Sequence, residues 1–124
     1  KRPNIHIQDM TNIYLKCLQY SDERIMGKVY NAGYENYKVM DIAKIVQKVI
    51  GENLVGIART HTDDNRSYHI SSKKMRRELG FEPEFTVEDA IRNLKEAFEA
   101  GKIPDPFNGI RYYNIKTMQV TDLA

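Results

Sequence analysis

The sequence lacks the features that mark membrane, secreted and strongly charged proteins. No apolar run approaches the ~20 residues that a membrane-spanning helix requires, and the first four residues lack the apolar centre of a signal peptide. The single cysteine, Cys17, cannot form an intramolecular disulfide, which fits a reducing compartment. The formal net charge of +2 is too small to indicate nucleic acid. We therefore expect a soluble, cytoplasmic protein without a membrane partner.

What the sequence does contain is a composition that folds. Hydrophobic residues make up 41% and charged residues 29% of the 124 positions, which excludes a disordered chain. The mass of 14.4 kDa suffices for one domain with one core, but not for a cofactor domain joined to a substrate domain. Because the first residue is Lys rather than Met, we expect a chain that is processed or cut from a longer one.

Two helices are predicted in the first half of the chain. Asp9 is expected to cap the first, whose apolar positions repeat at intervals of three and four residues up to Leu18. The second spans residues 40–50, with Asp41 in its first turn and Gly51 as its C-terminal stop. Each helix is expected to bury one apolar stripe.

Two further helices and a tail are predicted in the second half. A short basic helix begins after Ser71 or Ser72 and ends at Leu79, with Gly80 as its C-cap. The last helix starts in a sequence typical of a capping box, residues 86–89, and stops at residue 101. From residue 102 onward the prolines and glycines argue against regular structure. We therefore assign residues 1–101 to one lobe and residues 102–124 to an irregular tail.

Two strands are predicted on either side of the second helix. The segment from Gly27 to Gly33 is expected to be a short buried strand, and the segment from Leu54 to Ala58 a second. The order strand, helix, strand, with a crossover of ~20 residues between the strands, predicts a right-handed parallel unit. The predicted fold class is therefore α/β, with a small, mainly parallel sheet and several packed helices.

Three blocks, in this order, resemble the C-terminal substrate lobe of extended short-chain dehydrogenase/reductases, the NAD-dependent nucleotide-sugar epimerases and dehydratases. The first block is Arg-Pro-Asn-Ile-His-Ile-Gln-Asp-Met, residues 2–10. The second is Gly-Lys-Val-Tyr-Asn-Ala-Gly, residues 27–33, with the helix after it. The third runs from Asp-Asn-Arg-Ser-Tyr, residues 64–68, through Glu-Leu-Gly-Phe-Glu-Pro, residues 78–83, to the Thr86-capped helix. Together the blocks cover roughly residues 1–101.

The resemblance implies a substrate lobe of a Rossmann-type enzyme that lacks its N-terminal dinucleotide-binding domain. Such an enzyme transfers hydride transiently between the sugar and NAD, and its substrate lobe holds the nucleotide diphosphate. It also implies four substrate-binding residues. Arg2 and Arg66 are expected at the phosphates, Asp64 at a nucleoside hydroxyl, and Arg59 as a substitute for an arginine that relatives carry nearby. A lobe without its partner domain exposes an apolar interface, so we also expect self-association.

Neither the cofactor site nor the catalytic pair of that family is found in the sequence. Gly27 and Gly33 have the outer spacing of a dinucleotide loop, but Tyr30 occupies the position of the middle glycine. The family's catalytic Tyr and Lys stand four residues apart on a helix. Two pairs have that spacing here, Tyr34 with Lys38 and Tyr112 with Lys116, and they carry almost no information because chance alone gives about 0.7 such pairs. We assign no catalytic residue and expect NAD to bind the missing domain.

Other chemistry-bearing residues have simpler interpretations. The three histidines show no metal-ligand spacing, and Cys17 falls on the apolar stripe of the first helix. The basic turn of Lys73, Lys74, Arg76 and Arg77 is typical of a solvated helix face. A non-enzymatic interaction or nucleic-acid-binding module on the same scaffold is the alternative hypothesis, and it predicts steeply salt-dependent binding at this turn.

Overall fold

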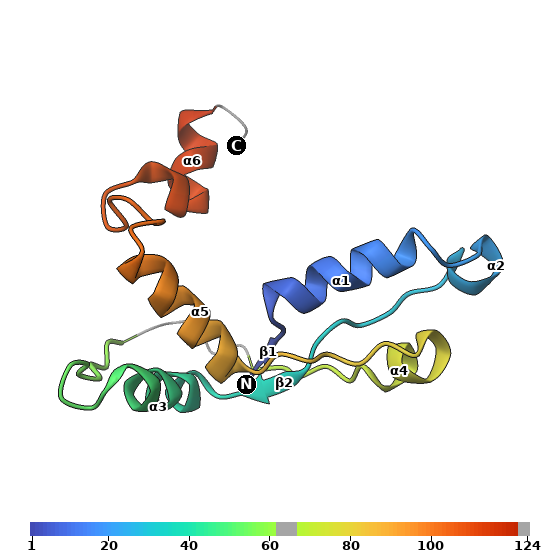
Figure 1. The fold of residues 1–124 in the computed structure, drawn as a ribbon, viewed down its shortest axis with the longest axis horizontal. Helices are drawn as coiled ribbons and strands as arrows, with labels where there is room; N and C mark the ends of the chain where they lie inside the picture. The colour runs from blue at the N-terminus through green and yellow to red at the C-terminus, as the bar shows by residue number, and fades with distance from the viewer. Residues whose placement is uncertain (62–66, 122–124) are drawn as a thin grey trace. The chain divides into compact units, whose positions relative to one another are not determined.

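The computed structural model describes residues 1–61 and 67–121. Contacts divide the chain into two compact units, Lys1–Asn93 and Leu94–Ala124, and each is described by itself. The first unit contains two short strands and the helices α1 to α4, and α5 crosses from it into the second unit (Figure 1). In the ranges described, no helix is both long enough and apolar enough to cross a membrane.

The strands form one antiparallel pair at the start of the chain. β1 (Arg2–Asn4) pairs with β2 (Glu35–Tyr37), and Arg2 lies opposite Tyr37 in the register. The predicted mainly parallel sheet is therefore wrong. Within the described residues the secondary structure is mostly helical, with six α-helices, one 3₁₀ turn and this two-stranded sheet.

The two predicted strands fail because their backbone groups bond to side chains and turns rather than to a neighbouring strand. In the segment 27–33, Ser72 Oγ accepts from the Gly33 N–H at 3.0 Å and donates to the Gly33 carbonyl at 2.6 Å. In the segment 54–58, the Gln47 side chain donates to the Val55 carbonyl at 2.9 Å, and the Leu54 N–H closes a turn onto Gly51. Without ladders on either side, the predicted parallel unit does not form.

The predicted helices are confirmed with small changes at their ends. α1 spans Ile7–Cys17 and α3 spans Val39–Ile50. The C-cap of α3 is Gly51, whose φ is 126°. α4 spans Lys73–Leu79 and stops at Gly80 with φ of 65°, a left-handed conformation that glycine adopts without a Cβ clash. α5 spans Val87–Glu99.

The start of α5 forms the expected capping box. The Asp89 carboxylate accepts from the Thr86 N–H at 2.9 Å, and Thr86 Oγ1 accepts from the Asp89 N–H at 3.2 Å. The hydrogen bond that the Thr86 hydroxyl donates to the Asp89 carboxylate lowers the pKa of Asp89, and the bond from the Thr86 N–H lowers it further. The short-range sequence pattern was sufficient to predict this start.

Three elements were not expected. α2 (Asp22–Ile25) forms in the polar segment after α1, where no helix was predicted. The 3₁₀ turn η1 (Ile110–Tyr112) and α6 (Asn114–Val120) form beyond residue 102, where no regular element was predicted. The division into a lobe ending at residue 101 and a tail stays a prediction.

The core of the first unit lies between α1, α4 and the segment that follows α4. Ile13, Met75, Leu79 and Phe81 are its buried hydrophobic side chains, and Cys17, Tyr20 and Tyr30 pack against them. The Tyr20 hydroxyl donates to the Leu79 carbonyl at 2.7 Å, which fastens the end of α1 to the end of α4. The position of Cys17 beside this core agrees with the sequence interpretation.

Candidate functional site

The structure places Arg2 against Tyr68, a residue 66 positions later in the sequence. The Arg2 guanidinium carbon lies 5.4 Å from the centre of the Tyr68 ring, within cation–π range. Backbone contacts hold the two segments together, because the Tyr68 N–H donates to the Lys1 carbonyl at 3.2 Å and the Lys1 nitrogen donates to Ser67 Oγ. Arg2 is half-buried, whereas Tyr68 is 53% exposed. The two segments therefore meet at an accessible surface.

The strand pair positions Arg2 on this surface. In β2, the Tyr37 hydroxyl donates to Glu35 Oε1 at 2.8 Å, while Glu35 Oε2 accepts from the Val87 N–H at 2.9 Å. Glu35 thus links the strand pair to the first turn of α5. The arginine side chain is carried on a strand rather than on a free end, which restricts where its planar fork of donors can point.

The Glu35 carboxylate also sets the protonation of its neighbour. The hydrogen bond to Glu35 raises the pKa of the Tyr37 phenol above 10.0, with burial as a second cause. A phenol with a raised pKa stays protonated at neutral pH, which is the opposite of what a catalytic base requires. Tyr37 is therefore a positioning hydrogen-bond donor next to Arg2.

The other three predicted substrate residues have different outcomes. Arg59 is exposed in the irregular segment after α3, and its side chain makes no hydrogen bond or ion pair with any other residue that the structure describes. Asp64 and Arg66 lie outside the described residues, so their predicted roles stay predictions. Arg66 directly precedes Ser67 in the sequence, and Ser67 contacts Lys1.

The sequence analysis missed the part that Asp9 plays. Asp9 does not cap α1. His6 occupies the N-cap position, and its Nδ1 accepts from the Gln8 N–H at 3.1 Å. The Asp9 side chain is fully buried and accepts from the Glu84 and Phe85 N–H groups, both at 3.1 Å. A signal was present, because Asp9 is four residues before Ile13 and so shares its inward face.

His6 is buried as well, and it contacts α1, α5 and the segment before α5. Its Nε2 lies 3.1 Å from Asn93 Oδ1 on α5, and its ring stacks on Phe85 with 4.8 Å between centroids. These contacts give His6 a structural role. Together, His6 and Asp9 fix the segment 84–85 against the start of α1.

The residues that imitate the catalytic pair of the family do not lie together on a helix. Tyr34 precedes β2, and Lys38 is the N-cap of α3. Tyr112 is in η1, whereas Lys116 is in α6 and lies over the ring of Tyr113 at 4.3 Å. Neither arrangement resembles a Tyr and a Lys on one helical face.

The glycine pair also does not fit a dinucleotide. Gly27 to Gly33 is irregular, and β2 rather than a helix follows it in the chain, so the segment lacks the strand, loop and helix order of a dinucleotide site. We derive no chemical step through NAD for this chain. Among residues 1–61 and 67–121, no cluster of three or more His, Cys, Asp or Glu side chains is arranged to hold a metal.

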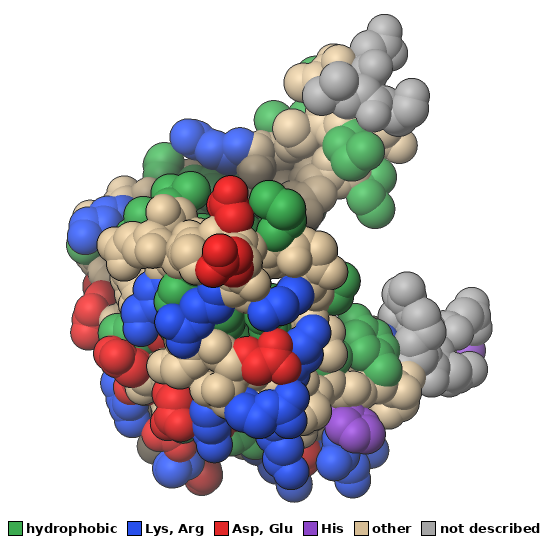
Figure 2. All heavy atoms as spheres, turned by 90° about the vertical axis from the view of Figure 1, so that its right-hand side faces the viewer, with side chains coloured by type: hydrophobic (Ala, Val, Ile, Leu, Met, Phe, Trp, Pro, Cys, Tyr) green, Lys and Arg blue, Asp and Glu red, His purple; other side chains and the backbone are tan. Residues whose placement is uncertain are grey.

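The basic turn of α4 is a mixed surface. Figure 2 shows Lys and Arg side chains interspersed with Asp and Glu on this face, rather than a patch of one sign. Arg77 donates to Glu78 at 2.9 Å and lowers the pKa of that carboxyl. Glu78 in turn accepts from the Tyr30 hydroxyl at 3.1 Å, and burial together with this carboxylate raises the pKa of Tyr30. Part of the positive charge is therefore neutralised locally.

Comparison with known proteins gives no assignment. No family model matches the chain, and no solved structure matches it. Function has to be inferred from the geometry and from the sequence blocks.

Proposed function

We propose that this chain is the substrate-binding portion of an NAD-dependent nucleotide-sugar epimerase or dehydratase, catalytically incomplete alone. In this proposal the chain grips the nucleotide diphosphate, a separate dinucleotide-binding domain holds NAD, and the whole enzyme is cytoplasmic. The observation that carries the proposal is the contact of Arg2 with Tyr68. Arg2 belongs to the first block of the family resemblance and Tyr68 to the third, so the blocks expected to share a ligand lie together.

The chemistry of the contact suits a diphosphate. A guanidinium that lies over an aromatic ring can still donate hydrogen bonds in its own plane, and phosphate oxygens accept such bonds in pairs. In the sequence, Arg66 directly precedes Ser67, which contacts Lys1. A second guanidinium therefore belongs to the same stretch of sequence as Tyr68. Two arginines match the two adjacent charges of a nucleoside diphosphate.

The contribution of this chain is binding rather than a chemical step. Holding the diphosphate at a distance from the reacting sugar carbon supplies binding energy that orients the sugar. Sugar-facing groups from the dinucleotide-binding domain complete the site in this proposal.

The proposal is tested by calorimetric titration of the full chain with uridine diphosphate and thymidine diphosphate. Saturable binding is expected for at least one of them, and Arg2→Ala and Arg66→Ala are each expected to weaken it about tenfold or more, because each removes charge-assisted hydrogen bonds. Lys44→Ala is the matched control, since Lys44 is an exposed cation of α3 and makes no hydrogen bond or ion pair to other described residues.

Two results would overturn the proposal. One is affinity for both diphosphates that is unchanged in Arg2→Ala and Arg66→Ala. The other is tight binding of single-stranded RNA or DNA at physiological salt, weakened by substitutions in the basic turn of α4, while neither diphosphate binds. The second result would favour the nucleic-acid-binding alternative.

A further inference from the structure

The four cations of α4 divide into two pairs with different surroundings. Lys74 Nζ donates to the Val29 carbonyl at 2.8 Å and lies 4.7 Å from the centre of the Tyr30 ring. Arg77 is paired with Glu78. Lys73 and Arg76, three positions apart and so on one face of the helix, instead line a pocket.

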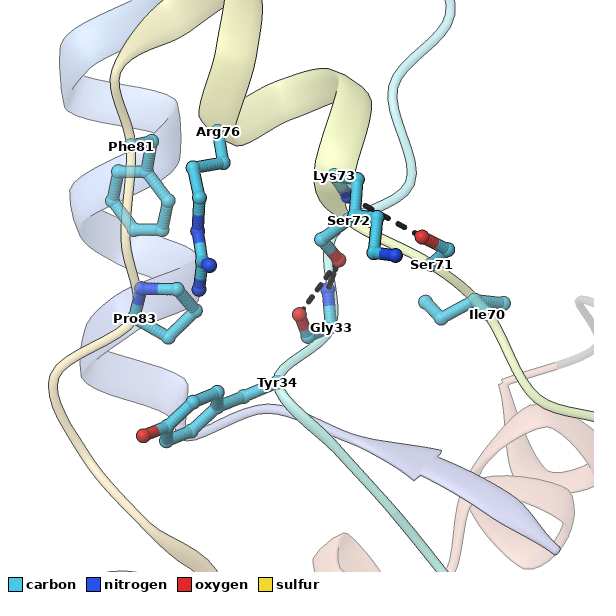
Figure 3. A pocket seen from close by; sticks show the side chains of 9 residues that line it. All are labelled: Gly33, Tyr34, Ile70, Ser71, Ser72, Lys73, Arg76, Phe81 and Pro83. Atoms are coloured by element: carbon cyan, nitrogen blue, oxygen red, sulfur yellow. Dashed lines mark hydrogen bonds between the residues drawn. The ribbon is translucent and has the colours of Figure 1, made fainter.

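The pocket has a volume of about 240 Å³ and lies within the first unit. Arg76 extends along one wall beside Phe81 and Pro83, and Lys73 lies on the other side next to Ser71 (Figure 3). Tyr34 closes the lower end in that view. Cationic and hydroxyl groups thus face apolar ring surfaces across one cavity.

Several donors at this pocket are unused. The Lys73 ammonium makes no hydrogen bond or ion pair with another residue of the described ranges, and neither does the Tyr34 hydroxyl. Arg76 uses only Nε, which lies 2.9 Å from Glu82 Oε1, so both of its terminal nitrogens remain available. None of the residues that line the pocket is acidic. The pocket is therefore rich in hydrogen-bond donors and positive in charge.

Two segments that are far apart in the sequence are joined by hydrogen bonds at the base of the pocket. Ser72 Oγ bonds to both backbone groups of Gly33, 39 positions away. A Cβ at Gly33 would come within 2.6 Å of the Ile70 side chain, so the backbone and that side chain are already in close contact. These contacts fix the backbone around the donors before a ligand binds, and such preorganisation reduces the entropy cost of binding.

We propose that this pocket binds the phosphoryl group of a small phosphate monoester. A dianionic phosphoryl group accepts several hydrogen bonds at once, which matches an ammonium, a half-free guanidinium and a phenol. The rings of Phe81 and Pro83 give the organic part of the ester an apolar wall. The site does not involve Arg2 or Tyr68, and it stands independently of the proposed function.

The test is a titration of the isotope-labelled full chain by NMR, with inorganic phosphate and phenyl phosphate as probes and sodium chloride at matched ionic strength as reference. Saturable shifts are expected at the amides of Ser71, Ser72 and Lys73 with both phosphates, and phenyl phosphate is expected to bind more tightly. Arg76→Gln and Lys73→Gln are each expected to weaken binding about tenfold. Arg77→Gln, the matched control on the same helix, leaves the affinity unchanged.

A further variant keeps the proposal falsifiable if Arg76→Gln disturbs folding. Glu82→Gln frees Arg76 Nε and is expected to tighten phosphate binding, whereas loss of binding in that variant would contradict the assignment. Equal shifts with sodium chloride, or equal weakening by Arg77→Gln and Arg76→Gln, would show only a diffuse attraction of anions and would overturn it. Saturable shifts confined to the amides around Arg2 and Tyr68 would assign the anion to the Arg2 contact instead and would also overturn the proposal.

Discussion

The two units of the chain differ in how far apart in the sequence their hydrogen-bonded residues lie. In Lys1–Asn93, hydrogen bonds join residues far apart, such as His6 with Asn93 across 87 positions. In the described part of Leu94–Ala124, the side-chain hydrogen bonds join residues no more than 8 positions apart, with Tyr112 to Pro104 the longest. The structure of the first unit therefore depends on contacts between distant parts of the sequence, whereas that of the second depends on local turns.

Burial follows the same division. The four buried hydrophobic side chains all belong to the first unit, and no side chain of residues 94–121 is buried. A region with few buried apolar contacts opens at lower free energy than a region with a core. The comparison teaches that cooperative unfolding should be a property of residues 1–93, and the predictions below are arranged to test it.

The largest effect is expected from Asp9→Ala. The substitution leaves the Glu84 and Phe85 N–H groups buried without an acceptor, and each unsatisfied donor costs about 1–3 kcal/mol, so the free energy of unfolding should fall by about 4 kcal/mol. Urea unfolding followed by circular dichroism measures this change. Asp22→Ala, at an exposed acid in the first turn of α2, is the control and should change stability by about 1 kcal/mol or less. If Asp9→Ala lowered the free energy of unfolding by no more than Asp22→Ala does, the long-range hydrogen bonds of Asp9 would not be important for stability.

A smaller, pH-dependent effect is expected from Asp89→Asn. The pKa of Asp89 is lowered by hydrogen bonds from Thr86, so the contribution of this residue to stability is present above its ordinary pKa of 3.8 and is lost as the pH falls through the folded-state pKa. Replacing the carboxylate should therefore flatten the fall of stability between about pH 5 and about pH 2. Acid titration of the unfolding midpoint tests this. Glu96→Gln, at an exposed position of the same helix, should leave the slope unchanged.

The smallest effect is expected from Tyr113→Phe in the second unit. The substitution removes only an exposed hydrogen bond, 2.8 Å from the hydroxyl to the Phe107 carbonyl, so the unfolding of residues 1–93 should change by less than about 0.5 kcal/mol. Amide exchange should become faster around Phe107 while the core amides near Met75 keep their rates. A global loss of protection would show that the two units unfold together and would break the comparison.

The elements that sequence reasoning predicted are those that local residues determine. The helices follow from apolar spacing, and their ends at Gly51 and Gly80 follow from the conformational freedom of glycine. The strands were not predictable in this way, because a strand forms only where the backbone of another segment can form hydrogen bonds with it. The apolar residues between Gly27 and Gly33 indicate an extended chain, but they cannot show that a serine side chain will bond where a neighbouring strand was expected.

The candidate site was predictable to a similar extent. Arg2 was selected from the order of residues around it, and its half-buried position on a strand agrees with a fixed role. The contact with Tyr68 depends on closing a loop of more than sixty residues, and no local pattern encodes that. Arg76 and Lys73 were interpreted as part of a solvated face, and both residues are exposed. The sequence does not show that Phe81 and Pro83 line a pocket with them.

The double hydrogen bond of Ser72 to Gly33 has a consequence for association between molecules. An extended segment whose N–H and carbonyl are both free is a template on which a strand from another chain can add. At Gly33 both groups are already taken by one hydroxyl, and Lys74 occupies the carbonyl of Val29 nearby. Side chains thus block this stretch as an edge for intermolecular sheet growth, so Ser72→Ala should promote aggregation even where the fold survives.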